Sequence, residues 1–392
     1  MRMRIPQSSL KSLLLGFLLF LYPGLAFSQH YVQTNLVSNV AGRAPVTDPN
    51  LQNAWGLVHS PTSPFWISNN AGGTSTLYSI DATGAAHIVP INAPADFVAV
   101  PNAPSQPAPG SPTGVMFNGS ATDFLLAPGQ HAFFLFVTED GTVQGWNPNV
   151  NVLSSVIKVD HSQKPTPANG AVYKGATIVE VNGKRFILAA NFRSAHIDVF
   201  DTNFTPVDLD DDAFSDDDIP NGFAPFNVQA IGPNVVVTYA RQDAARHDPV
   251  GGTGFGFVDV FSPSGRLRAH LQHGPWFNAP WGAVLAPGDF GEFSHALLIG
   301  NFRGGTIAAF NPITGRFLGN VLNPDGSTLN IDGLWTLEFG NSDGSRNAAG
   351  LLKSNAGSAL TLFFTAGTDG EKNGLFGTLT PVAAEFGDDD EQ

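Results

Sequence analysis

The chain has 392 residues, of which 42% are hydrophobic and 13% charged, so it is long enough to bury a large core. Its formal net charge is −14 and its 19 Lys and Arg residues are scattered singly, which excludes the clustered basic surface that nucleic acids require. It has no Cys, which excludes disulfides and thiolate chemistry, and its 43 Gly and 29 Pro leave little room for long helices.

The first 28 residues differ in character from the rest of the chain. Arg2, Arg4 and Lys11 precede an apolar run at residues 13–21, and Ala26-Phe-Ser fits the small-x-small pattern of a cleavage site. An uncleaved membrane anchor is the alternative, but the apolar run is short for a span of about 20 residues. We therefore predict a signal peptide that is cut after Ser28, and a secreted or periplasmic mature protein without stable membrane insertion.

The remainder of the sequence repeats itself at a spacing of 52–61 residues. Each copy contains short apolar strands separated by turns rich in Asn, Asp, Gly or Pro, and this spacing accommodates one four-stranded blade of a β-propeller. Continuous apolar runs such as residues 133–137 are typical of inner strands that are buried on both faces. The residues at equivalent positions of the six opening strands are Gly56, Gly114, Gly175, Asn227, Gly282 and Thr336.

In chain order, residues 31–39 form a strand before the first repeat, and the sixth repeat ends after three strands near Pro381. We expect the N-terminal strand to complete the last blade as its outer strand, because this closure removes an exposed sheet edge. The Pro-rich residues 101–112 are predicted to be an ordered surface loop, since the repeats continue on both sides. The predicted fold is therefore an all-β, six-bladed propeller over residues 29–383, followed by an acidic tail at 384–392; a pair of β-sandwiches does not explain six repeats.

Several strings in these repeats resemble known propeller sequences. Gly300-Asn-Phe-Arg-Gly-Gly-Thr-Ile and Phe310-Asn-Pro-Ile-Thr-Gly look like NHL-type repeats. Ile219-Pro-Asn-Gly-Phe-Ala-Pro-Phe-Asn-Val and Asp332-Gly-Leu-Trp-Thr-Leu resemble a family of uncharacterised exported bacterial proteins, some of which carry a PEP-CTERM sorting tail. The resemblance covers nearly the whole mature chain and implies a propeller fold and export, but no activity. This sequence lacks the sorting tail, so anchoring is not implied.

One face of the ring is the expected binding site, because the loops that lead into the inner strands and out of the second strands meet there around the central channel. Lys174 and Thr113 also belong to these loops, as do Asn70, Asp140 and Asp243. The residues that we select as candidate ligand-binding residues at this channel mouth are Asn53, Asn69, Glu139, Asn191, Arg193, Asn227, Arg241, Asn278, Asn301, Arg303 and Asp332.

Two interpretations of this polar set remain open. The residues either form a pocket that binds Ca²⁺ or an anionic or sugar-like ligand, or they serve the turns, because Asn bonds to its own backbone and tolerates left-handed conformations. The three Arg residues favour a carboxylate or phosphate ligand over a metal ion.

A run of Asp residues between positions 208 and 218 is the candidate metal site. Ca²⁺ binding needs several carboxylates at one point, but the Asp-x-Asp-x-Asp-Gly order of an EF-hand is absent. A solvated loop is the alternative for this run, which also contains Asp211 and Asp217. The candidate ligands for Ca²⁺, the one cofactor that the sequence suggests, are Asp208, Asp210, Asp212, Asp216 and Asp218.

His247 and Asp248 lie in a long Gly-containing loop over the fourth blade. They form either part of a lid or an acid/base pair, but adjacency in sequence does not make a dyad. The chain contains no Gly-x-Ser-x-Gly, HExxH, P-loop or dinucleotide motif, so we assign no catalytic residue.

Two functional hypotheses follow. The first is a monomeric, exported, non-catalytic binding or scaffold propeller that recognises a small polar ligand or a partner protein at the channel face. The second is a hydrolase of the divalent-metal-assisted, lactonase-like kind, which requires a carboxylate-rich mouth. Because Asn and Arg outnumber the acids among the selected residues, the sequence favours the first hypothesis.

Overall fold

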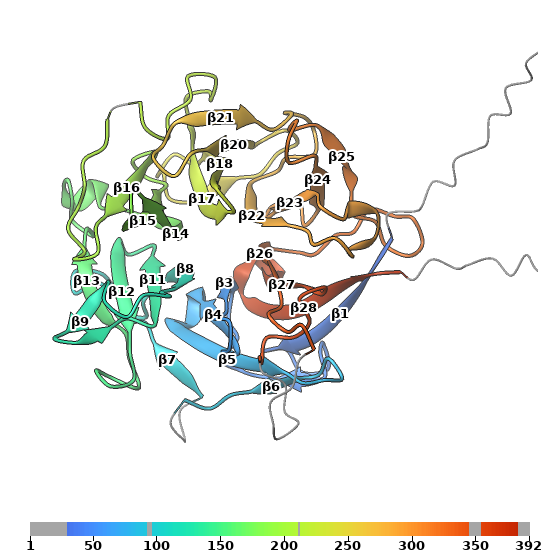
Figure 1. The fold of residues 1–392 in the computed structure, drawn as a ribbon, viewed down its shortest axis with the longest axis horizontal. Helices are drawn as coiled ribbons and strands as arrows, with labels where there is room; N and C mark the ends of the chain where they lie inside the picture. Colours follow the sequence, from blue (N-terminus) through green and yellow to red (C-terminus); the bar gives the residue numbers. More distant parts are fainter. Residues whose placement is uncertain (1–29, 92–95, 211, 345–353, 383–392) are drawn as a thin grey trace, which may run out of the picture.

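The computed structural model describes residues 30–91, 96–210, 212–344 and 354–382. The predicted signal segment, the acidic tail and Asp211 lie outside these residues, so the expectations for them stay predictions. The described chain forms six blade sheets arranged around a central axis and one additional two-stranded sheet, which confirms the six-bladed propeller (Figure 1). No helix within these residues has the length and apolar character needed to cross a bilayer.

The strands of each blade run outward from the axis in chain order, except that the outer strand of blade six is β1 (Figure 1). The inner strands are β3 (Ala54–Val58), β8 (Pro112–Phe117), β14 (Tyr173–Val181), β17 (Phe223–Ile231), β22 (Pro280–Leu285) and β26 (Leu334–Phe339). The second strands are β4 (Phe65–Asn69), β11 (Phe134–Thr138), β15 (Lys184–Asn191), β18 (Asn234–Gln242), β23 (Leu297–Asn301) and β27 (Leu362–Gly367).

The third and outer layers complete the blades. The third strands are β5 (Thr74–Ile80), β12 (Thr142–Trp146), β16 (His196–Phe200), β20 (Phe257–Phe261), β24 (Ile307–Phe310) and β28 (Asn373–Pro381). The outer strands are β6 (Ala86–Ile88), β13 (Val156–Asp160), β21 (Leu267–His270), β25 (Phe317–Asn320) and β1 (Tyr31–Ser38). The additional short elements are β2 (Val46–Thr47), β7 (Phe97–Ala99), β9 (Leu125–Ala127), β10 (Gln130–His131), β19 (Pro249–Val250) and α1 (Thr368–Glu371).

The repeat positions found in the sequence form a belt around the axis. A Cβ atom on Gly56 would lie 2.3 Å from the carbonyl oxygen of Thr113 in the next blade, and one on Gly175 would lie 2.0 Å from Asn227 Oδ1. Glycine is therefore required where neighbouring inner strands touch. At the remaining positions a polar side chain makes the same contact: Asn227 donates to the carbonyl of Trp281 at 2.9 Å, and Thr336 donates to that of Trp55 at 2.7 Å.

The core is divided among the blade interfaces. Each pair of adjacent blades encloses its own cluster of buried apolar side chains, so no blade buries its faces alone. Trp66 of blade one packs on Phe134 of blade two, for example, with ring centroids 4.2 Å apart. This arrangement explains why the inner runs are apolar on both faces.

The predicted closure by the N-terminal strand is confirmed. Strand β1 pairs antiparallel with β28, from Tyr31 opposite Pro381 to Ser38 opposite Leu375. The Tyr31 hydroxyl also donates to the carbonyl of Phe290 at 2.8 Å, which ties the strand to blade five. The beginning and the end of the described chain are thus joined in one sheet (Figure 1).

Blade three departs from the four-stranded expectation, since its described residues form the three strands β14, β15 and β16. The following segment makes a bridge between Phe200 and Pro206 and one further bond from Val207 N to Val199 O, and then leaves the sheet. Adjacent carboxylates at positions 208–218 repel one another and disfavour a ladder. The Pro-rich residues 101–111 form a loop without strand or helix before β8, as predicted.

Candidate functional site

A layer of aromatic side chains fills the channel near one end. The indole of Trp335 stacks on Trp55 and on Phe302, with ring centroids 3.6 Å and 3.8 Å away. Two indole N–H groups are bonded, from Trp335 to Asn53 Oδ1 and from Trp281 to the carbonyl of Lys174, both at 3.1 Å. We call this set the aromatic layer: Trp55, Phe192, Phe226, Trp281, Phe302 and Trp335.

Polar side chains from all six blades meet above the aromatic layer. They come from the loops before an inner strand or after a second strand, as the sequence predicted, except for Lys174, which is the second residue of the inner strand β14. We call them the mouth ring: Asn53 and Asn70 of blade one, Glu139 of blade two, Lys174 of blade three, Asp248 of blade four, Arg303 of blade five and Glu371 of blade six.

The mouth ring is a continuous chain of contacts. Arg303 Nη2 lies 3.8 Å from Glu371 Oε1, and Glu371 Oε2 accepts a hydrogen bond from Asn53 Nδ2 at 3.3 Å. Asn53 Nδ2 also donates to Asn70 Oδ1 at 3.1 Å, and Asn70 Nδ2 donates to Glu139 Oε2 at 2.8 Å. Each side chain is therefore oriented by its neighbours, which holds the ring in a defined geometry.

Lys174 is the buried cation of the mouth ring. Its side chain is 0% exposed, and its ammonium group bonds to Glu139 Oε1 and lies 3.3 Å from Asp248 Oδ1. The same Nζ atom lies 5.3 Å above the ring of Trp55, so the aromatic layer also stabilises its charge. Two carboxylates and an aromatic face thus compensate the cost of burying this charge.

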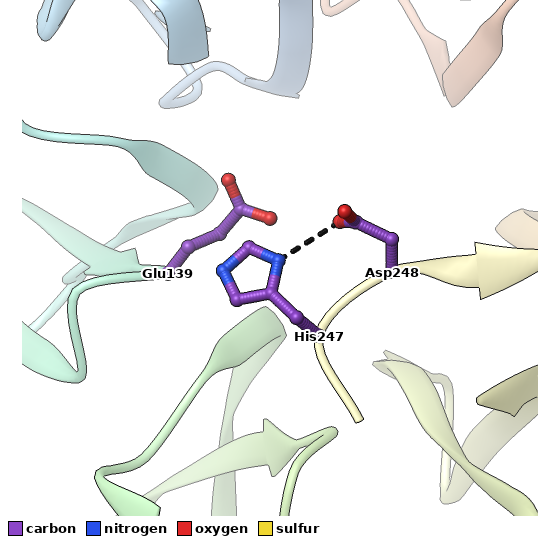
Figure 2. Close-up of side chains that lie close together, drawn as sticks. All are labelled: Glu139, His247 and Asp248. Carbon is purple, nitrogen blue, oxygen red and sulfur yellow. Dashed lines mark hydrogen bonds and ion pairs between the residues drawn. The ribbon is translucent and has the colours of Figure 1, made fainter. Parts of the chain in front are cut away.

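His247 joins Asp248 and Glu139 at the surface of the mouth ring, and the three side chains point toward one another (Figure 2). His247 Nδ1 lies 3.0 Å from Asp248 Oδ1, so the adjacent pair does form a hydrogen bond. This bond, with the nearby Lys174 charge, holds the pKa of Asp248 below its usual range. Burial raises the pKa of Glu371 across the ring.

These three residues offer ligand atoms within 4.8 Å of one another, as a metal ion would require. However, the ammonium group of Lys174 already contacts both of the carboxylates involved. A divalent ion bound there would meet a fixed positive charge, which weakens its binding. The donor set alone fits a metal, but its surroundings disfavour one.

Three of the predicted Asn residues serve turns instead. Asn69 donates to Thr74 and Thr76, Asn301 donates to the carbonyl of Trp276, and Asn191 donates to Asp198 Oδ2. All three end the second strand of their blade, and each also bonds across the turn that follows, which Asn301 does by donating to Thr306 Oγ1 at 3.1 Å. For these positions the turn interpretation describes what the side chains do.

The other predicted residues lie around or below the mouth ring. Arg193 donates to the carbonyl of Gly170 at 2.9 Å, and Arg241 covers the ring of Phe255 at 4.8 Å. Asn278 Oδ1 accepts from Gly252 N at 2.8 Å, and Asp332 Oδ2 accepts from Asp369 N at 2.7 Å. These contacts fix the loops that carry the ring.

Asn227 lies deeper than the sequence placed it. It stands in the middle of β17, within the belt of inner-strand contacts, and not in the loop before the strand. The difference arises because β17 begins at Phe223. Asn227 occupies the repeat position that is a glycine in other blades, and this position lies several residues inside the strand.

Glu371 is a ring residue that the candidate list lacks. It ends α1 in the turn between β27 and β28, which is the loop after a second strand, and its φ is +69°. The rule that selected Glu139 and Arg303 applies to this loop as well. A rule that takes the residues directly after each second strand does not reach it, because Glu371 lies four positions beyond Gly367, the last residue of β27.

Within the described part of the predicted metal run, two of the five candidate ligands, Asp216 and Asp218, belong to a group that could hold a metal ion. Asp208, Asp210, Asp212 and Asp218 are exposed, whereas the side chain of Asp216 is buried. Asp216 and Asp218 instead lie near His270 of β21. The structure therefore shows an acidic and histidine grouping on blade four, built from two of the five predicted ligands.

Comparison with known proteins places the chain among relatives of unknown activity. No family model matches the sequence. An uncharacterised protein of Acanthamoeba polyphaga mimivirus, R648, is 30% identical over 352 residues, which is 88% of this chain and 78% of the viral protein. The chain belongs to the R648 family. A second uncharacterised mimivirus protein, L690, is 28% identical over 88% of this chain and 84% of its own length.

These R648-family relatives are viral, so they do not support the bacterial origin that the sequence resemblance suggested. Among solved structures, a protein of unknown function from Bacteroides thetaiotaomicron superposes with a TM-score of 0.52 at 8% identity, over 89% of this chain and 76% of that one. A streptogramin B lyase covers 90% of this chain and 97% of its own at 13% identity, with a TM-score of 0.43. The first likeness concerns the fold alone, and the second is too loose to support an inference.

Proposed function

We propose that this protein is an exported, non-catalytic binding protein whose mouth ring holds a small polar ligand. The observation that carries the proposal is that every blade contributes a charged or amide side chain to one connected chain of contacts, which runs from Arg303 to Asp248. Turn chemistry alone needs contacts within a blade, whereas all of these contacts except the Asn53–Asn70 bond run between blades. Such a preorganised polar set above an apolar layer is typical of a ligand site.

The exposed members of the ring indicate the chemistry of the ligand. Asp248, Arg303 and Glu371 keep partly exposed side chains, and the 3.8 Å ion pair of Arg303 leaves its guanidinium with donors to spare. Within the ring, three carboxylates face two cations, so a phosphate dianion is disfavoured. A zwitterionic or hydroxyl-rich small molecule, which offers donors and acceptors together, fits this balance better.

The metal-assisted hydrolase is the competing function. Glu139, His247 and Asp248 favour it, because they supply three ligand atoms at one point. The contact of Lys174 with the carboxylates of Glu139 and Asp248 argues against it. We also assign no catalytic role to any other side chain near these residues. The Ca²⁺ expected at residues 208–218 concerns another part of the molecule and does not bear on the mouth.

Export and a monomeric state belong to the same proposal. Export rests on the n-region, apolar run and cleavage pattern of residues 1–28, and the net charge of −14 disfavours nucleic acid as a partner. Expression of the full chain in a bacterium, followed by N-terminal sequencing of the product, tests the export step. A mature protein that begins at Gln29 is expected, and an intact N-terminus on the exported protein would contradict it.

A thermal-shift screen with amino acids, monosaccharides and dicarboxylates tests the ligand proposal. A ligand at about 100 times its Kd stabilises the native state by about 2.7 kcal/mol, which is a clear rise in Tm. We expect this rise to be lost in Arg303→Ala and Glu371→Gln. The matched control is Arg316→Ala, because Arg316 is exposed in the same blade but lies in the turn between β24 and β25, at the opposite end of the strands.

The same screen decides between the two functions. Equal ligand shifts in wild type and Arg303→Ala would place the ligand elsewhere and contradict the proposal. A shift with Mg²⁺, Ca²⁺ or Zn²⁺ that disappears in His247→Ala would favour the hydrolase instead. If no small molecule raises Tm, the remaining version of the binding hypothesis is a propeller that binds a partner protein.

A further inference from the structure

A second charged cluster lies on the outer strands of blade four, away from the mouth ring (Figure 1). Asp259 of β20 pairs directly with His270 of β21, and His270 Nδ1 lies 3.0 Å from Asp259 Oδ1. The same nitrogen lies 3.0 Å from Asp216 Oδ2, which comes from the acidic loop after blade three. We call Asp216, Asp218, Asp259 and His270 the rim cluster.

Two carboxylates of the rim cluster are buried without enough partners. The side chains of Asp259 and Asp216 are 2% and 5% exposed, while that of His270 is 46% exposed. A single Nδ1–H group faces both carboxylates and can donate to only one of them. Among the described residues, Asp216 Oδ2, Asp259 Oδ2 and the hydroxyl of Tyr239 have no hydrogen-bond partner.

The surroundings do not supply the missing positive charge. Within the described part of the chain, His270 is the one basic residue that forms an ion pair with Asp216 or Asp259. Arg268, on the same strand as His270, donates instead to Asn234 and to the carbonyl of Pro233. Buried carboxylates in this situation are stabilised by a proton or by a bound cation.

We infer that the rim cluster is a binding site for a divalent transition-metal ion such as Zn²⁺ or Mn²⁺. Asp216, Asp218 and His270 each offer a ligand atom within 4.8 Å of the others, and the Asp259 carboxylate adjoins them. Three carboxylates and one imidazole suit these ions, whereas Ca²⁺ prefers oxygen ligands alone. The calcium site expected from the Asp run is thereby replaced by a different ion and a different ligand set.

The site has a route to solvent and a structural consequence. Asp216 and Tyr239 line a cavity of about 540 Å³ between blades three and four, and the imidazole of His270 is itself 46% exposed, so the cluster borders on solvent. The bound ion joins the loop after β16 to β20 and β21. It thus holds in place the segment that follows the three-stranded sheet of blade three.

Isothermal titration of the metal-free full-length protein with Zn²⁺, Mn²⁺, Ca²⁺ and Mg²⁺ tests the inference, with Tm measured in parallel. We expect one equivalent of Zn²⁺ or Mn²⁺ to bind and to raise Tm, with weaker or no binding of Ca²⁺. Asp259→Asn and His270→Ala remove ligands, so each weakens binding at least about 100-fold, since even outer-shell losses cost 10–100-fold.

Two control variants locate the ion. Asp208→Asn removes an exposed carboxylate of the same loop and is expected to leave binding unchanged, as is Glu139→Gln at the mouth ring. Loss of binding in Glu139→Gln with retention in Asp259→Asn would place the ion at the mouth and overturn the inference. Preferential Ca²⁺ binding that Asp208→Asn abolishes would overturn it in favour of the acidic loop, and so would the absence of any transition-metal binding.

The Tm of each variant also shows whether that variant is folded. Asp259→Asn relieves repulsion between two buried carboxylates, so the metal-free variant is expected to melt at or above the wild-type Tm. If this variant does not fold, His270→Ala carries the test, because the half-exposed imidazole is the part of the cluster nearest to solvent.

Discussion

The mouth ring and the rim cluster contain similar side chains in opposite electrostatic states. At the mouth, Glu139 and Asp248 face the buried ammonium group of Lys174, so the charges are compensated within the protein. At the rim, Asp216 and Asp259 share one imidazole. The comparison teaches that a group of acids and a His suggests a metal only where no internal cation already occupies the carboxylates.

Replacement of Lys174 by Met is the strongest way to break this comparison. The change leaves Glu139 buried without its cation, which is expected to cost about 3–5 kcal/mol in the free energy of unfolding. Urea denaturation followed by Trp fluorescence measures it, with the exposed Lys164→Met as the matched control. A loss below about 1 kcal/mol would show that Lys174 does not compensate these carboxylates.

The same substitution also tests whether Lys174 prevents a metal ion from binding at the mouth ring. Without the ammonium group, Glu139, His247 and Asp248 are left as three ligand atoms close together. In a His270→Ala background, which removes Zn²⁺ binding at the rim cluster, we therefore expect Lys174→Met to gain a Zn²⁺-dependent rise in Tm that disappears when His247→Ala is added. Zn²⁺ binding at the mouth of the wild-type protein would contradict this account.

At the rim cluster we expect a smaller effect, which is a change in the pH dependence of the free energy of unfolding. Burial and the charge of the nearby Asp216 raise the pKa of Asp259 from an ordinary value of 3.8 to about 7, although the hydrogen bond with His270 lowers it. Because the native state then holds a proton that the unfolded state has released, stability is highest at low pH and falls as pH rises from about 4 through 7. In metal-free protein, Asp259→Asn is expected to remove about 2 kcal/mol of this loss at pH 8.

Denaturation curves at pH 4, 6 and 8 in EDTA measure this difference. Asp208→Asn is the control, since Asp208 is exposed and is expected to follow the wild-type pH dependence. Parallel pH profiles for wild type and Asp259→Asn would show that the rim carboxylates are not under strain.

The smallest effect is expected at the edge of the mouth. Burial raises the pKa of Asp140 to about 6, against a 3.2 Å hydrogen bond from Ser111 N that lowers it. The sign is the same as at Asp259, so stability falls as pH rises from about 4 through 6. Because Asp140 is partly exposed, Asp140→Asn is expected to change this slope by less than about 1 kcal/mol, and a steeper slope in the variant would contradict the assignment.

The sequence could predict the ring because its signal is repeated. Gly56 and Gly175 recur at the point where inner strands touch, and the spacing of the repeats indicates six blades. The closure by residues 31–39 follows from the sixth repeat, which ends after three strands. Blade three could not be predicted in the same way. The strand lost there depends on repulsion within residues 208–218, which a repeat pattern does not report.

From the sequence, the candidate site can be predicted only to the level of the loops that carry its residues. The loop rule finds Glu139, Lys174 and Arg303, but the partners of each lie in other blades, and no local pattern joins Lys174 to Asp248. Asp259 illustrates the limit more sharply. In the sequence it is a polar residue in an alternating strand, and only the fold brings it to Asp216, 43 positions earlier.

The pairing of β1 with β28 also orders events during folding. The first strand to be synthesised has its partner at the far end of the polypeptide, so the circle stays open until residues 373–381 are made. Until then, both edges that later meet are unpaired, and they offer a template to other copies of the chain. A shortened N-terminus that lacks Tyr31–Ser38 would make this transient hazard permanent.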